Sequence, residues 1–69
     1  MSENEFIELQ ERILKFLIKN KGSSRISNIN VELCSGSGIA KEVILAIDFL
    51  QEQGFVESVG IVNPRIILL

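Results

Sequence analysis

Residues 39–69 read IAKEVILAIDFLQEQGFVESVGIVNPRIILL, and the hydrophobic period changes within this stretch. Up to Gly54 the apolar residues recur every three or four positions, as they do on one face of a helix. After Gly54 two short runs rich in β-branched residues follow, with a turn between them. The change of period predicts a helix from about Ile39 to Gln53, closed by Gly54, and then a hairpin. The inward stripe of that helix should consist of Val43, Ala46, Ile47 and Leu50.

The hairpin is delimited by turn residues. Phe55–Val59 is predicted to form its first strand and Arg65–Leu69 its second. The turn, Gly60–Pro64, contains the dipeptide Asn63-Pro64, which disfavours regular structure.

An amphipathic helix is expected at the amino-terminal end of the sequence. Ser2 and Glu5 have the spacing of a capping box, and Met1 and Phe6 that of a hydrophobic staple. Gly22 supplies the left-handed conformation with which helices often end. The predicted apolar stripe consists of Phe6, Leu9, Ile13, Phe16 and Leu17, and it is widened by Ile7, Leu14 and Ile18.

A second, shorter helix is expected between these two. Ser23–Ile26 is predicted to be short and extended at best, and Ser27 to cap the helix that follows. Ile29 and Leu33 lie four residues apart on one face of it. The glycines and serines of residues 35–38 break the chain before the third helix.

This order of elements is that of a winged helix-turn-helix. We therefore predict an α+β, mainly helical fold, with three helices and a C-terminal β-hairpin wing, as a single domain spanning residues 1–69. Apolar residues make up 46% of a chain that is too short to bury them all. Some of that surface should face a partner, and a homodimer is the simplest possibility.

Composition excludes several classes of function. The chain has no histidine and a single cysteine, Cys34, which leaves no internal disulfide and no zinc site. We expect no enzyme activity, no metal, no cofactor and no small-molecule substrate. The amino terminus is acidic and no long apolar segment follows it, so we expect no signal peptide, no membrane contact and a cytoplasmic location. The net charge of −2 means that any DNA binding needs a local basic patch.

One family resemblance involves the stretch Arg12-Ile13-Leu14-Lys15-Phe16-Leu17 and the later Lys41-Glu42. These residues resemble the Zalpha domains of the RNA-editing adenosine deaminases, which bind left-handed DNA, and the layout matches over nearly the whole chain. Zalpha domains contact DNA through an asparagine and a tyrosine on the third helix, where this chain has Ile44 and Asp48. Of their wing proline pair and tryptophan, only Pro64 is present. The resemblance implies the fold and argues against left-handed DNA as ligand.

A second resemblance covers Val43 to Gly54, centred on Ala46-Ile47-Asp48-Phe49-Leu50. It is similar to the third helix of the winged-helix domain that ends the middle subunit of replication protein A. That domain is acidic and docks other proteins, so this resemblance implies protein docking.

The outer face of the predicted third helix should carry Lys41, Ile44, Leu45, Asp48 and Glu52. In a DNA-reading winged helix this face enters the major groove and presents Arg, Lys, Asn or Gln to the base edges. Here it offers one lysine, two aliphatic residues and two carboxylates, which suit a protein surface better. Two alternatives stay open: Ile44 and Leu45 belong to the core, or they form a homodimer seam.

Other candidate contacts lie in loops. Ser37 precedes the third helix and could touch a DNA phosphate, although a plain interhelical turn is the alternative. Asn63 and Arg65 belong to the wing, which commonly lies along a DNA backbone or minor groove. Three further cations, Lys19, Lys21 and Arg25, lie near the end of the first helix, where they suit the helix dipole.

Two hypotheses of function follow. In the first, the chain is a small transcriptional regulator that contacts double-stranded DNA with its third helix and wing. In the second, it is an acidic module that docks a protein partner on the apolar outer face of that helix.

Overall fold

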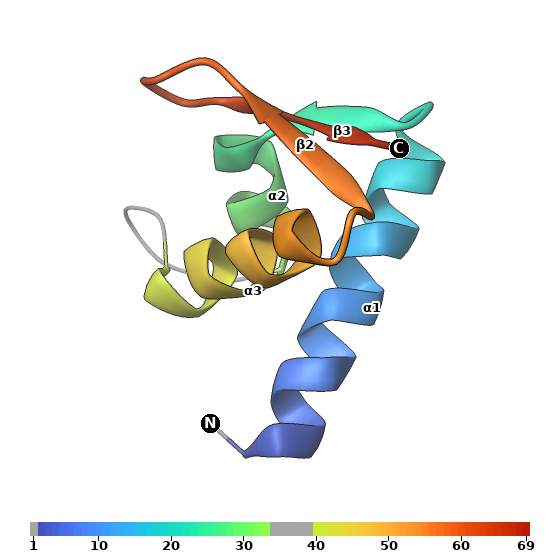
Figure 1. Ribbon diagram of the computed structural model, residues 1–69, viewed down its shortest axis with the longest axis vertical. Coiled ribbons are helices and arrows are strands. Elements are labelled where there is room, and N and C mark those ends of the chain that lie inside the picture. The colour runs from blue at the N-terminus through green and yellow to red at the C-terminus, as the bar shows by residue number, and fades with distance from the viewer. Residues whose placement is uncertain (1, 34–39) are drawn as a thin grey trace.

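The computed structural model describes residues 2–33 and 40–69, and it has the α+β, mainly helical architecture predicted from the sequence. Three helices and a three-stranded sheet form a winged-helix-like arrangement (Figure 1). The elements, in chain order, are α1 (Glu3–Lys19), β1 (Ser23–Arg25), α2 (Ile26–Leu33), α3 (Lys41–Glu52), β2 (Val56–Val59) and β3 (Arg65–Leu68).

The sheet is antiparallel in the order β1-β3-β2, so the last strand in the sequence is the central one. The predicted hairpin is present as β2 and β3, with Val56 opposite Leu68 and Val59 opposite Arg65. The segment after α1, which was predicted to be short and extended, forms an additional strand, β1, that pairs with β3. In Figure 1 the sheet lies across the top of the molecule, α1 runs down one side, and α2 and α3 lie beneath the sheet.

Helix α1 begins and ends where local signals place it. The Ser2 hydroxyl accepts a hydrogen bond from the Glu5 N–H at 3.2 Å and donates one to the Glu5 carboxylate at 3.0 Å. At the other end Gly22 has a φ of 90° and its N–H donates to the Leu17 carbonyl at 2.7 Å. Lys21, which was expected to suit the helix dipole at this end, also has a positive φ of 64°. Met1, the predicted staple partner, lies outside the described residues.

The core lies between the three helices and the inner face of the sheet. Helix α3 buries the four residues of its predicted stripe, and β2 and β3 contribute one buried residue each. The buried apolar residues are Leu9, Ile13, Leu17, Ile26, Ile29, Val43, Ala46, Ile47, Leu50, Val56 and Ile66.

The predicted apolar stripe of α1 is too wide. Ile7 and Ile18 were expected to extend it, yet they are 47% and 65% exposed. The elements packed against α1 bury a narrow line through Leu9, Ile13 and Leu17. Successive residues of a helix are about 100° apart, so a neighbour of Leu17 such as Ile18 points well away from that line.

The start of α2 was predicted wrongly. Ser27 does not cap this helix, because α2 begins one residue earlier, at Ile26. Two of its free N–H donors are satisfied by the wing turn instead. The Ile26 N–H donates to the Pro64 carbonyl at 2.9 Å, and the Ser27 N–H donates to Asn63 Oδ1 at 3.0 Å. A side chain 36 residues away therefore does the work expected of a local cap.

Helix α3 is shorter than predicted at its start, where Ala40 precedes the first helical residue, Lys41. The Ala40 N–H donates to Asn30 Oδ1 of α2 at 2.7 Å, which ties the two helices together. Ile39 lies outside the described residues. The predicted stop is confirmed, because Gly54 has a φ of 82°. No helix within residues 2–33 or 40–69 has the length and apolar character needed to cross a membrane.

Two substitutions in α2 should separate buried from exposed aliphatic residues. Ile29 is fully buried and Val31 is exposed. Ile29→Ala should lower the free energy of unfolding by about 2–5 kcal/mol, because it removes buried methyl groups and leaves a cavity. Val31→Ala should change it by less than about 0.5 kcal/mol. Urea denaturation followed by circular dichroism measures both, and equal losses would mean that this face of α2 is assigned wrongly.

Candidate functional site

Two arginines lie side by side on the outer face of the sheet, at the base of the wing. Arg25 of β1 is directly opposite Arg65 of β3, and both are exposed. The Arg65 guanidinium donates to the Ser23 hydroxyl at 3.2 Å, and the Arg25 guanidinium donates to the Asn63 carbonyl at 3.1 Å. No carboxylate within residues 2–33 and 40–69 forms an ion pair with either arginine. The wing base therefore presents two positive charges that form no ion pair with the described part of the chain.

Arg65 was predicted as a candidate contact, whereas Arg25 was expected to belong to the solvated end of the first helix. The register between β1 and β3 places Arg25 opposite Arg65, so Arg25 belongs to the wing base. That register depends on two segments 40 residues apart in the sequence, and no local pattern predicts it. The short run Ser23–Arg25 was the only available signal, since an extended segment next to a hairpin can pair with it.

The wing turn is held firmly against α2. Asn63 has a φ of 49°, a conformation that asparagine tolerates better than most residues. Its side chain accepts the Ser27 N–H, and its carbonyl accepts the Arg25 guanidinium. Asn63 is thus a structural residue of the wing, as its predicted place in the turn implies, and its side-chain bond to α2 was not predicted.

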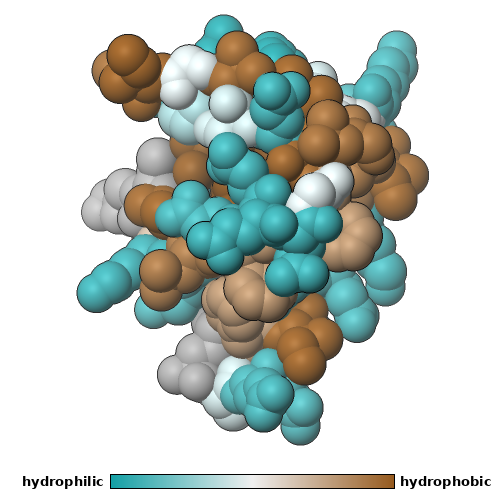
Figure 2. All heavy atoms as spheres, in the orientation of Figure 1, coloured by the Kyte–Doolittle hydropathy of each residue, from teal (hydrophilic) through white to brown (hydrophobic). Residues whose placement is uncertain are grey.

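The tip of the wing is apolar. Ile61 is 98% exposed and Val62 is 87% exposed, so neither side chain packs against the rest of the described protein. Figure 2 shows the hydrophobic colour at the end of the hairpin, at the upper left of the view. These two residues were predicted to lie in the turn, and no role was predicted for them.

The outer face of α3 is as predicted. Ile44 and Leu45 are 41% and 50% exposed, which rules out the alternative that they are core residues. Lys41, Asp48 and Glu52 are exposed on the same side of the helix. Asp48, Gln51 and Glu52 line a shallow surface hollow of about 440 Å³. The face is therefore both apolar and acidic.

One aromatic residue next to this face was not singled out by the sequence. Phe49 is exposed, although its ring meets that of Phe6 edge to face, with the centroids 5.9 Å apart at an angle of 75°. It adds apolar surface on the side of α3 that faces α1. Leu45 and Phe49 are four residues apart, which places them on the same side of a helix, so their spacing could have indicated this apolar surface.

The predicted contact residues do not form one compact site. Lys41, Ile44, Leu45 and Asp48 lie on α3, whereas Asn63 and Arg65 lie in and beside the wing turn. Among the described residues, no hydrogen bond or ion pair joins the two groups. Ser37 lies outside the described residues. The structure thus presents two separate candidate surfaces, the wing with Arg25, and the outer face of α3.

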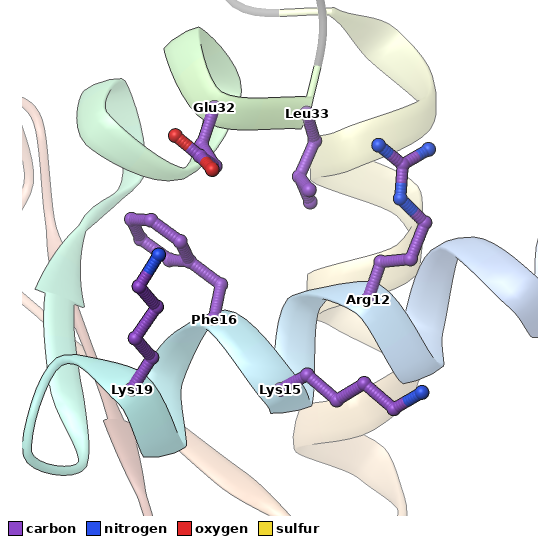
Figure 3. Close-up of a pocket in the computed structure, with 6 residues that line it drawn as sticks. All are labelled: Arg12, Lys15, Phe16, Lys19, Glu32 and Leu33. Atoms are coloured by element: carbon purple, nitrogen blue, oxygen red, sulfur yellow. The ribbon is translucent and has the colours of Figure 1, made fainter.

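A third feature is a hollow of about 240 Å³ between α1 and α2. Figure 3 shows the Phe16 and Leu33 side chains reaching into the space between the two helices, with Arg12 and Lys19 on either side of it. Lys15 and Glu32 complete the lining. Its charged residues are exposed, and the described residues add no buried polar group that could orient a ligand.

No set of three histidine, cysteine or carboxylate side chains converges anywhere in residues 2–33 and 40–69. Comparison with known proteins gives no match to any family model, any curated protein or any solved structure. The two resemblances noted in the sequence thus stay predictions. The winged-helix-like description rests on the arrangement of the elements alone.

The stability of variants at Asn63 should depend on whether they keep the side-chain acceptor and whether they tolerate a positive φ. Asn63→Asp keeps an oxygen that can accept the Ser27 N–H. Asn63→Gly removes that acceptor, but glycine adopts a positive φ without strain. Asn63→Ala removes the acceptor and also strains the backbone. We expect stability to fall in that order, with Ala costing about 2–4 kcal/mol from the unpaired donor and the strained φ together. Thermal melting of the three variants measures the order. An alanine variant as stable as the parent would show that this hydrogen bond does not hold the wing.

Proposed function

We propose that this winged-helix-like domain binds double-stranded DNA, and that the wing rather than α3 makes the main contact. The observation that carries the proposal is the pair Arg25 and Arg65, which stand directly opposite each other without an ion pair among the described residues. Like charges opposite one another destabilise a sheet. A polyanion laid across the pair would offset that repulsion.

The chemistry of the two side chains supports a phosphate ligand. Guanidinium groups are planar, permanently charged and able to donate two parallel hydrogen bonds to a phosphate. Arg25 and Arg65 each use an Nη1 donor within the protein, and each retains other N–H donors. Both side chains lie on the solvent side of the sheet, next to a turn that is fixed to α2.

The distribution of charge supplies the local basic patch that the net charge of −2 does not. Residues 12–31 contain five cations and no carboxylate. The cations are Arg12, Lys15, Lys19, Lys21 and Arg25. They lie along the second half of α1 and on through β1, which is an edge strand of the same sheet as the wing.

Helix α3 gives little reason to expect base reading. Its outer face presents Ile44 and Leu45 together with Asp48 and Glu52, and the carboxylates would repel phosphates. Phosphate contacts position a protein on DNA but carry no sequence information. The proposed binding is therefore mainly sequence-independent. A transcriptional regulator with this surface would have to obtain its specificity from DNA shape or from the wing tip.

The three arginines of the chain provide a matched test. Arg65→Gln should weaken binding to all duplex sequences about equally and lower the salt slope by about one unit per lost phosphate contact. Arg65→Lys should restore most of the salt slope, since the charge is kept. Arg12→Gln, on α1 and outside the wing base, is the comparison and should weaken binding less than Arg65→Gln does. The measurement is a titration of fluorescent duplex DNA at several salt concentrations.

Two results would contradict the proposal. One is no binding of the parent protein to duplex DNA even at low salt. The other is an equal loss in Arg65→Gln and Arg12→Gln, which would mean that only the total charge matters.

Protein docking is the second candidate, and the outer face of α3 favours it. Ile44, Leu45 and Phe49 are exposed large apolar side chains, and Asp48 and Glu52 lie among them. Burying an aliphatic side chain completely contributes about 1.5–3 kcal/mol. The carboxylates favour a partner segment that carries basic residues beside its apolar ones.

The double variant Ile44→Lys, Leu45→Gln separates the two functions. Both residues are at least 40% exposed, so the fold should survive. If the wing binds DNA, binding should hold or tighten, because the change adds a positive charge. If α3 docks a protein, the variant should lose that partner, because a lysine enters a dry interface. Circular dichroism melting alongside the DNA titration tests this, and an unfolded variant would contradict the surface assignment of both residues.

A further inference from the structure

Helix α1 is divided into an acidic and a basic half. All four carboxylates of the helix precede Arg12, and from Arg12 onward all its charged residues are cations. These charged side chains are exposed. The acidic residues are Glu3, Glu5, Glu8 and Glu11, and the basic ones are Arg12, Lys15 and Lys19. A helix charged in this way is complementary to a second copy of itself that runs in the opposite direction.

An apolar line runs along one flank of the same helix. Ile7, Glu11, Leu14 and Ile18 are spaced at i, i+4, i+7 and i+11, which places them in one row on the helix surface. Ile7 and Ile18 are 47% and 65% exposed, and Leu14 is partly buried. These are the residues that the sequence assigned to a widened core stripe. Of these residues, Ile7 and Ile18 are left exposed by the described part of the domain.

We propose that this flank of α1 is a homodimer interface, in which two copies of the helix pack antiparallel about a twofold axis. An axis that passes between residues 12 and 13 sets Ile7 opposite Ile18 of the partner subunit. Glu11 then lies beside Leu14 of the partner subunit and within one helical turn of Lys15 of the partner subunit. Because the axis repeats every contact, both ends of the interface match.

The charges favour the antiparallel direction. Parallel copies would bring Glu8 and Glu11 against the same carboxylates of the partner, and lysines against lysines. Antiparallel copies bring each acidic half against a basic half, and their helix dipoles are also opposed. Opposite charges across an interface fix its register as well as its direction.

The helix is large enough for this role. Its 17 residues span about 25 Å. A specific interface buries at least about 1,000 Å² in total, or about 500 Å² from each partner, which is roughly a tenth of the 4709 Å² exposed by each protomer. Leu69, exposed beyond the end of β3, lies near the end of α1, because the Leu68 N–H donates to the carbonyl of Gly22. Figure 2 shows apolar residues gathered on this side, where α1 passes the C-terminus.

The dimer is compatible with DNA binding. In Figure 1 the wing tip and α1 lie on opposite sides of the molecule, so a partner on α1 leaves the wing tip of each copy uncovered. The proposal shares Lys15 and Lys19 with the basic patch, but it uses neither Arg25 nor Arg65, so the dimer can form whether or not the wing binds DNA.

Complementary charge reversal provides the test. Glu8→Lys with Glu11→Lys replaces the two carboxylates nearest the basic half of the partner subunit by cations, and Lys15→Glu with Lys19→Glu replaces two cations of the basic half by carboxylates. Each double variant alone should dimerise about tenfold or more weakly than the parent, because like charges then meet at both ends. A mixture of the two should form a heterodimer at least as tight as the parent dimer. Sedimentation equilibrium across the micromolar range measures all four samples, with circular dichroism to verify folding.

Two substitutions of exposed isoleucines test whether the interface lies on α1 or at the wing tip. Ile18→Gln should weaken the dimer, whereas Ile61→Gln, at the more exposed wing tip, should not. Raising the salt concentration should also weaken the parent dimer, since screening reduces the attraction between opposite charges. A monomeric parent protein, a dimer unaffected by either charge reversal, or a mixture that stays monomeric would each overturn the proposal. So would a dimer that Ile61→Gln disrupts and Ile18→Gln leaves intact.

Discussion

The wing turn and the first turn of α2 hold each other in place. Pro64 and Asn63 accept two of the N–H groups that α2 leaves free, and Arg25 donates back to the Asn63 carbonyl. These bonds close the gap between two segments that are far apart in the sequence. They fix the end of β1, the start of α2 and the conformation of the turn together. The position of every residue at the wing base follows from this contact.

Local signals predicted the elements whose causes are local. The hydroxyl of Ser2, the positive φ of Gly22 and Gly54, and the buried stripe of α3 each depend on residues within a few positions. The third helix was recognised by its period alone, and its outer face was assigned correctly for the same reason. A helix imposes a fixed angle between neighbours, so one correct inward residue determines the rest.

Features with distant causes were missed. Sequence analysis placed a cap at Ser27 because it has a hydroxyl, but the acceptor comes from Asn63. It grouped Arg25 with the end of a helix, since nothing near Arg25 indicates that Arg65 lies across from it. It expected Ile7 and Ile18 to be buried, because the width of a buried stripe depends on which elements pack against the helix. The candidate residues on α3 could therefore be predicted from the sequence. At the wing base, Arg65 could be predicted but Arg25 could not.

The central position of β3 has a consequence for the synthesis of the protein. Ribosomes make β1, α2, α3 and β2 before they make Arg65–Leu68, yet β1 and β2 pair only with this strand. Until it emerges, β1 and β2 have no strand to pair with, and Ile66 is missing from the core. Contacts between such distant segments form slowly, because closing the loop costs entropy before any bond is gained. A nascent chain that stops before Arg65 would thus expose its apolar helices to the chaperones and proteases of the cell, whereas the addition of four residues allows the sheet to assemble.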